Sequence, residues 1–311
     1  MEIQTEKGVK AEERLNLTYY GGSDIYSDGA VEDRLLEIAK THSEAQLNEV
    51  IAKTKDWSIL YHFSHIRRNI VSWMPIEKEA TVLEVGSGCG AITGALAAMA
   101  KKVTCIDLSK RRSLINACRN SDYDNFEILV GNFKDIEKEL PEKYDYITLI
   151  GVFEYGEAYI GGGHPYEDFL KILKKHLKPS GKLVIAIENR WGLKYFAGCR
   201  EDHFGTFYEG INGYPESSGV KTFVRSELEA MFSKCGFKEW QFYYPYPDYK
   251  LPYVIYSDDY LPHPGDLRQN YGNYDRDRIV VFNEDRVFDD VCREGLFPQF
   301  SNSYLVELSG E

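Results

Sequence analysis

Apolar and polar positions follow two alternating periods along the middle of the chain. Short apolar runs with β-branched residues, typical of strands buried on both faces, alternate with segments whose apolar residues recur at helical spacing. This pattern predicts seven strands, near residues 81–86, 103–107, 126–130, 145–150, 182–187, 238–244 and 253–257. Regular alternation of strands and helices indicates a doubly wound α/β sheet with parallel strands.

The flanking segments differ from this central pattern, so we expect three parts. Residues 1–78 form an N-terminal loop and helical extension, with a short helix at 31–40 and further helices over 43–73. Residues 79–261 form the central domain. Its last two strands are joined by PYPDYKLP, which is too short for a crossover helix, so these strands should be antiparallel. Residues 262–311 form a C-terminal extension, with one helix near 284–294 and a strand-like YLVEL.

Composition narrows the classes of protein. The formal charge of -12, with no long run of lysine or arginine, disfavours nucleic acid as a partner. No apolar stretch approaches the length of a membrane span and the N-terminus is charged, so a cytoplasmic location is expected. The six cysteines show no CxxC spacing and are expected to be reduced, mostly buried thiols. The sequence therefore predicts no metal site.

A glycine-rich loop follows the first predicted strand, in the stretch VLEVGSGCGAITG. Gly86 and Gly88 allow a ligand to approach the backbone, and a helix expected to begin near Ala91 directs free N–H groups toward it. The next strand ends in Asp107, 21 residues after Gly86, where a Rossmann-like sheet presents a carboxylate to ribose hydroxyls. Together these features predict a nucleotide-type crevice.

Two classes of ligand compete for this crevice. Gly86, Gly88 and Ala91 satisfy a relaxed G-x-G-x-x-A fingerprint, which is compatible with a nicotinamide dinucleotide. Glu84, directly before the glycines, would repel a pyrophosphate and attract a cationic ligand. The loop after the third strand offers the Asn132 amide and the Phe133 ring to a purine. These details favour the cationic ligand.

Five motifs at the ends of the predicted strands resemble those of class I S-adenosylmethionine-dependent methyltransferases. They are LEVGSGCG, CIDLS, VGNFKDI, YDYITLIGVFEY and HLKPSGKLVIAIEN, and the resemblance covers about residues 55–260. The stretches CGAITGALA, IENRWGLKYFAG, EDHFGTF and FYYPYPDYKLP are similar to a subgroup encoded among bacterial polysaccharide and glycosyltransferase genes. The resemblance implies S-adenosylmethionine as cofactor and S-adenosylhomocysteine as product. It also implies a small-molecule or glycan-precursor acceptor and a possible glycosyltransferase partner or fusion.

The resemblance assigns cofactor contacts by position. Glycines would approach the methionine part, an acid would accept from the ribose, and residues of two loops would bracket the adenine. The implied cofactor residues are Glu84, Gly86, Ser87, Gly88, Asp107, Leu108, Asn132, Phe133 and Gly151. Many family members carry an acid where this chain has Asn132.

Transfer of a methyl group to a hydroxyl also needs a base, because the hydroxyl proton must leave as the new bond forms. Glu154 follows the fourth strand, Glu188 closes the fifth, and His203 lies in an insertion over residues 190–221 that we expect to act as a lid. Structural roles are open for each of them. Glu154 could orient its loop, Glu188 could pair with Arg190 or Arg200, and His203 could bridge backbone groups.

The function predicted from the sequence is methyl transfer to a hydroxyl. The alternative is a regulatory or scaffolding module that binds S-adenosylmethionine or its product and works with a glycosyltransferase. An NAD-dependent oxidoreductase is the third hypothesis, and it is the least favoured of the three.

Overall fold

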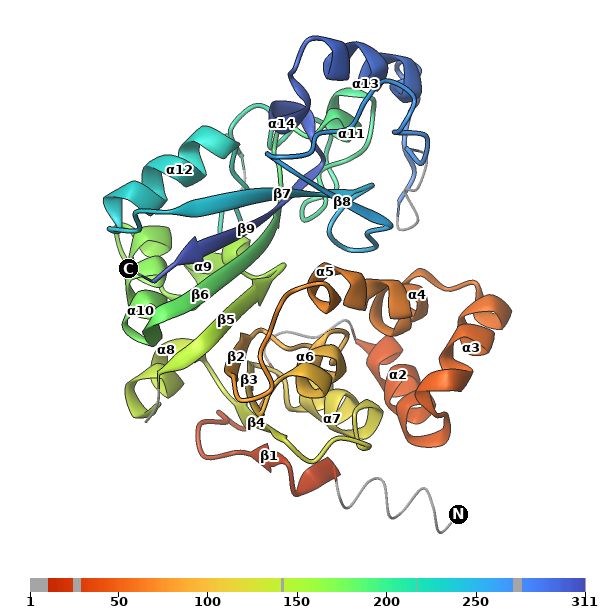
Figure 1. Cartoon of the computed structure of the whole chain (residues 1–311). Coiled ribbons are helices and arrows are strands. Elements are labelled where there is room, and N and C mark those ends of the chain that lie inside the picture. Colours follow the sequence, from red (N-terminus) through yellow and green to blue (C-terminus); the bar gives the residue numbers. More distant parts are fainter. Residues whose placement is uncertain (1–10, 25–28, 141–142, 217, 271–275, 311) are drawn as a thin grey trace. The chain divides into compact units, whose positions relative to one another are not determined.

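The computed structural model describes residues 11–24, 29–140, 143–216, 218–270 and 276–310 (Figure 1). The chain divides into two compact units. The first comprises residues 1–149 and 176–181, and the second comprises residues 150–175 and 182–311. Each unit contains strands and helices, and each is described in turn.

The first unit contains a sheet of parallel strands. In spatial order these are β1 (Leu15–Asn16), β4 (Phe126–Val130), β3 (Lys102–Asp107), β2 (Thr81–Val85) and β5 (Tyr144–Ile150). Every strand pair in this unit is parallel. The parallel sheet predicted from the apolar runs is confirmed for this part of the chain.

The helices of the first unit follow the predicted pattern. They are α2 (Ala30–Thr41), α3 (Leu47–Thr54), α4 (Trp57–Phe63), α5 (Asn69–Ser72), α6 (Thr93–Met99), α7 (Lys110–Arg119) and α8 (Phe133–Ile136), with short 3-10 turns η1 (Glu44–Gln46), η2 (His65–Arg68) and η3 (Glu137–Glu139). Helix α7 packs on β3 and β4, and α2 packs on α7 (Figure 1). The helices expected at 31–40 and within 43–73 are confirmed. Helix α6 begins two residues after the expected Ala91, where the carbonyl of Ile92 accepts from the N–H groups of Ala95 and Leu96.

The second unit contains antiparallel strands. In spatial order these are β6 (Leu177–Glu188), β9 (Ser303–Ser309), β7 (Trp240–Tyr246) and β8 (Val254–Ser257), and the first residues of β6 belong to the first unit. The pairing of β7 with β8 confirms the predicted antiparallel end. Strand β9 lies between β6 and β7 (Figure 1), and its Val306 is paired with Ile185 on one side and Phe242 on the other.

Short helices accompany these strands. They are η4 (Phe153–Tyr155), α9 (Gly156–Tyr159), α10 (Pro165–Lys175), α11 (Leu193–Phe196), α12 (Arg225–Lys234), α13 (Glu284–Arg293) and α14 (Phe297–Phe300). Helix α10 packs against α9 and α12, and α13 packs against α14. The helix expected near 284–294 is therefore confirmed as α13.

The prediction of seven strands is wrong, because the described residues contain nine. Strand β1 has two residues, too few for a periodic pattern to reveal. Strand β9 was expected as a strand-like segment of the C-terminal extension, but its place between β6 and β7 depends on pairing with residues far away in the sequence. The division at residues 78 and 261 and the lid over 190–221 stay predictions.

The cysteines and the apolar character of the helices were both considered in the sequence analysis. All six cysteines are thiols and five of them are buried, as predicted. Within the ranges that the structure describes, no helix has both the length and the apolar character needed to cross a membrane.

Glu84 connects β2 to the start of α6. Its side chain is buried and accepts hydrogen bonds from the Thr93 hydroxyl at 2.7 Å and the Cys105 thiol at 3.4 Å. Burial raises the pKa of Glu84 to about 7, although these two hydrogen bonds lower it. The glycine loop thus lies between two elements that are tied together by a carboxyl group close to its titration point.

The raised pKa of Glu84 predicts a pH-dependent stability. The folded chain holds this proton more tightly than the unfolded chain, whose carboxyl has the ordinary value of 4.5. The resulting stability is complete below that value and is lost as pH rises through about 7. Between pH 5 and pH 8 the native chain should therefore lose about 2.5 kcal/mol of unfolding free energy relative to Glu84→Gln. Urea unfolding of both proteins at the two pH values measures this difference, and identical pH dependence would contradict it.

The central place of β9 predicts that the C-terminal segment contributes strongly to stability. Leu308 is fully buried and paired with Leu183 of β6 and Trp240 of β7. Leu308→Ala should lower the free energy of unfolding by about 2–5 kcal/mol through lost apolar contact and the cavity that remains. The control Leu296→Ala, at a leucine that is 43% exposed, should cost much less. Equal effects in urea unfolding would show that β9 is not part of the core.

Candidate functional site

The glycine loop is held by the end of β3. The N–H groups of Gly86 and Ser87 donate to the carbonyl of Ile106 at 2.8 and 3.1 Å, and the N–H of Gly88 donates to Oδ2 of Asp107 at 2.7 Å. Gly88 has a φ of +52°, which a glycine adopts without strain. The carboxylate expected to bind a ribose therefore also fixes the loop.

Asp107 is a half-buried acceptor at this edge of the sheet. Its Oδ1 accepts from the N–H of Ser109 at 2.9 Å, so each carboxylate oxygen already has one backbone partner. Burial raises the pKa of Asp107, while the hydrogen bonds from Ser109 and Gly88 lower it. A carboxylate oxygen has two lone-pair sites, so both oxygens retain capacity to accept from a ligand.

The predicted adenine pair has structural roles of its own. Oδ1 of Asn132 accepts from the N–H of Lys134 at 2.9 Å and so caps α8, while the Phe133 ring is buried. Leu108 is half-buried beside Asp107. Helix capping and core packing account for Asn132 and Phe133 without a ligand, so their contact with adenine stays a prediction.

Gly151 opens the second unit just after β5. Its φ is +70°, and its N–H donates to the carbonyl of Ala186 at 2.9 Å. A Cβ atom at this position would lie 2.7 Å from the hydroxyl oxygen of Tyr249. Both the backbone angle and the close approach of Tyr249 require glycine here.

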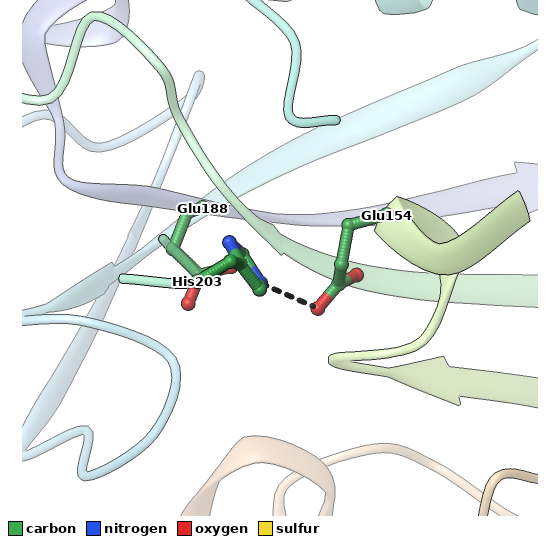
Figure 2. Close-up of side chains that lie close together, drawn as sticks. All are labelled: Glu154, Glu188 and His203. Atoms are coloured by element: carbon green, nitrogen blue, oxygen red, sulfur yellow. Dashed lines mark ion pairs between the residues drawn. The ribbon is translucent and has the colours of Figure 1, made fainter. Parts of the chain in front are cut away.

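Three sequence-predicted catalytic residues come together in the second unit (Figure 2). Glu154 lies in η4, Glu188 is the last residue of β6, and His203 lies in the segment after α11. One ligand atom from each lies within 4.8 Å of the others. The side chains of Glu154 and Glu188 are 1% and 0% exposed, so the two carboxyl groups share a site from which water is largely excluded.

Glu201 holds His203 in place. The Nδ1 atom of His203 lies 2.9 Å from Oε1 of Glu201, whose Oε2 accepts from the N–H groups of His203 and Phe204. The Nε2 atom of His203 lies 3.8 Å from Oε1 of Glu154. The imidazole thus stands between two buried carboxyl groups, and the hypothesis that it bridges backbone groups does not describe its contacts.

Glu188 pairs with Lys250, and not with the predicted partners Arg190 and Arg200. The Lys250 ammonium group donates to Oε1 of Glu188 and, at 2.8 Å, to Oδ1 of Asp202. Arg190 pairs with Glu227. Arg200 donates to the backbone carbonyl groups of Asp277 and Gly205. The proposed pairing of Glu188 with Arg190 or Arg200 is therefore wrong.

Lys250 belongs to a buried network that the sequence did not reveal. Asp202 also binds Lys194 at 2.9 Å and accepts from the hydroxyl of Tyr195. Burial raises the pKa of Asp202, but Lys194 and Lys250 lower it by more, so that it lies well below the ordinary value. Asp202 lies in EDHFGTF and Lys250 lies in FYYPYPDYKLP, and these stretches are at least 35 residues apart. Nothing in the sequence predicted that the two side chains form an ion pair.

The surroundings also change the acid–base behaviour of the cluster. Burial lowers the pKa of His203, but Glu154 and Glu201 raise it by more, so that it lies well above the ordinary value. Burial raises the pKa of Glu154. With only these neighbours, the imidazole is cationic at neutral pH and cannot accept a further proton.

Comparisons with known proteins find similarity to methyltransferases. Residues 83–183 match the family described as "Methyltransferase domain". The chain is 26% identical over 165 residues to ribosomal RNA small subunit methyltransferase A of Geobacillus sp., covering 52% of this chain and 55% of that protein. It is 28% identical over 158 residues to a ubiquinone biosynthesis O-methyltransferase of Rickettsia typhi, covering 47% and 58%. The chain spans just over half the length of these curated relatives.

Solved structures give a weaker similarity. A SAM dependent methyltransferase from Archaeoglobus fulgidus is 14% identical, with a TM-score of 0.49 and coverage of 82% of this chain and 100% of that one. These values are too low to add to the family match. Residues 83–183 include the end of β2, the glycine loop, Asp107 and the start of β6. Over these residues the chain is therefore similar to a methyltransferase domain.

Proposed function

We propose that the chain transfers the methyl group of S-adenosylmethionine to a hydroxyl group of a small molecule or glycan precursor. The observation that supports a hydroxyl acceptor is the buried cluster of Glu154, Glu188 and His203, because a hydroxyl needs a group that takes its proton. The glycan precursor rests on the resemblance to a subgroup encoded among bacterial polysaccharide genes. A cytoplasmic location and a glycosyltransferase partner are parts of the same proposal.

The first unit has features that fit the cofactor. The hydroxyl of Ser87 is buried and has no hydrogen-bond partner in the described residues. A Cβ atom on Gly88 would meet open space, so a ligand has room beside this backbone. In the proposal Gly86, Ser87 and Gly88 hold the methionine part, and Asp107 binds the ribose. Glu84 orients the loop, and Leu108, Asn132 and Phe133 surround the adenine.

S-adenosylmethionine supplies the electrophilic methyl group and its own leaving group, so the protein mainly positions the acceptor. Among the three candidates, Glu154 is best suited to take a proton. Its Oε2 is buried and has no hydrogen-bond partner in the described part of the chain. His203, next to its Oε1, would hold the carboxylate in position. The insertion over 190–221 supplies His203 and would close over the acceptor.

Asp107 provides a test of cofactor binding. Asp107→Ala should weaken the affinity for S-adenosylmethionine at least about tenfold, because the ribose loses charge-assisted hydrogen bonds and Gly88 loses its acceptor. Asp107→Asn retains an oxygen for Gly88 and should lose less. Calorimetry measures the affinity of both variants for S-adenosylmethionine. A separate titration of the native chain with NAD tests the alternative ligand. Unchanged affinity in folded Asp107→Ala would remove Asp107 from the site.

Glu154 provides a test of the chemistry. With S-adenosylmethionine labelled in its methyl group and a panel of sugar nucleotides and monosaccharides, Glu154→Gln should lower turnover about 100-fold or more while cofactor affinity is retained. Glu284→Gln is the matched control, since Glu284 is equally buried in the same unit but pairs with Arg278. Cofactor binding without transfer to any acceptor in the native chain would favour the regulatory module.

A further inference from the structure

The cluster in Figure 2 has the composition of a metal site. It contains two carboxylates and one imidazole, and their nearest ligand atoms lie within 4.8 Å of one another. We propose that Glu154, Glu188 and His203 together bind one divalent transition-metal ion, Zn²⁺ or Mn²⁺ in preference to Mg²⁺. This inference concerns ion binding alone and does not depend on the proposed methyl transfer.

Two buried oxygens support the proposal. Oε2 of Glu154 and Oε2 of Glu188 are both inaccessible to solvent and lack a hydrogen-bond partner among the described residues. A carboxylate oxygen buried without a partner is costly, and native proteins rarely leave one unsatisfied. Oε1 of Glu188 is paired with the ammonium group of Lys250, so Oε2 of Glu188 is the oxygen that would coordinate an ion. A cation between the two carboxylates would satisfy both oxygens.

The surroundings of His203 match those of a metal-binding histidine. Such a histidine usually donates its second ring N–H to a carboxylate, which fixes the tautomer and directs the other nitrogen to the metal. Here Nδ1 of His203 lies 2.9 Å from Oε1 of Glu201, and Nε2 faces Glu154. Two backbone N–H groups in turn hold Oε2 of Glu201. Glu201 therefore acts as a positioning residue.

The distance between His203 and Glu154 fits ligation better than direct contact. At 3.8 Å, Nε2 of His203 and Oε1 of Glu154 are too far apart for a hydrogen bond. Two ligands that lie roughly 2.0–2.2 Å from a tetrahedral Zn²⁺ ion are about 3.4 Å apart, so the observed separation is a few tenths of an ångström longer than ligation requires. The three ligand atoms lie within 4.8 Å of one another, so ligation of one ion requires them to move closer together.

The charges around the cluster are unbalanced without an added cation. The connected network has five carboxylates and three side chains with a permanent positive charge. The carboxylates are those of Glu154, Glu188, Glu201, Asp202 and Asp248, and the cations are Lys194, Lys250 and Arg276. The carboxylates outnumber the permanent cations, so an added cation would lower the excess of negative charge.

The donor set indicates which ion. Imidazole nitrogen suits Zn²⁺ and other transition metals, whereas Mg²⁺ prefers oxygen ligands and retains several waters, for which a site of this burial has little room. Three protein ligands leave at least one coordination position open on Zn²⁺.

Metal titration of the chelator-treated full chain tests the inference without cofactor or acceptor. Zn²⁺ in competition with a chromophoric chelator should bind at one site per chain, Mn²⁺ should bind more weakly at the same site by electron paramagnetic resonance, and Mg²⁺ should not compete at equal concentration. His203→Ala and Glu154→Gln should each weaken Zn²⁺ binding at least about 100-fold. Glu201→Gln should weaken it about 10- to 100-fold.

The matched control is again Glu284→Gln. Oε2 of Glu284 is also buried and lacks a hydrogen-bond partner in the described residues, but no histidine accompanies it, so this variant should retain native Zn²⁺ affinity. Circular dichroism establishes folding, and Glu154→Gln and Glu201→Gln decide the matter if His203→Ala does not fold. Absence of one-site Zn²⁺ binding, or equal affinity in the native chain and these variants, would overturn the proposal. Loss of Zn²⁺ binding in a chain that still transfers methyl groups would leave the proposed function intact and reject only the ion.

Discussion

The second unit is organised by the cost of burying carboxyl groups. Glu154 and Glu188 are almost completely removed from solvent, and an ionised carboxylate in such a place must be neutralised, hydrogen-bonded or protonated. Lys250 meets this need for one oxygen of Glu188, and His203 stands beside one oxygen of Glu154. Two further contacts of the insertion adjoin these pairs, since Asp202 binds Lys250 and Glu201 binds His203.

In the first unit, the glycine loop is positioned by backbone hydrogen bonds. The loop is held by backbone N–H groups that donate to Ile106 and Asp107, both at the end of the neighbouring parallel strand. Because the carboxyl ends of parallel strands meet at one edge, a few backbone hydrogen bonds suffice to position the loop. Substitutions of the buried carboxylates in the second unit are expected to act through side-chain charge, whereas those of the glycines in the loop act through backbone geometry.

This difference explains what the sequence could predict. Apolar runs and glycine spacing are local, so strands β2 to β5, the glycine loop and Asp107 were located to within a residue or two. The sequence also nominated Glu154, Glu188 and His203, because each follows a predicted strand or lies in the insertion. It could not show that Lys250 neutralises Glu188 or that Glu201 holds His203. Those contacts depend on how distant segments fold together, and charged residues on loops carry no periodic signal.

The position of β9 has a consequence for how the chain matures during synthesis. Ser303 pairs with Glu188, which leaves the ribosome more than a hundred residues earlier, and β7 pairs with the other side of the same late strand. Until β9 is made, β6 and β7 each present an open edge on this side, and such edges can pair with other chains. Contacts at this sequence separation also form slowly. The nascent chain is therefore most prone to aggregate in the interval after β7 emerges and before its last strand is complete.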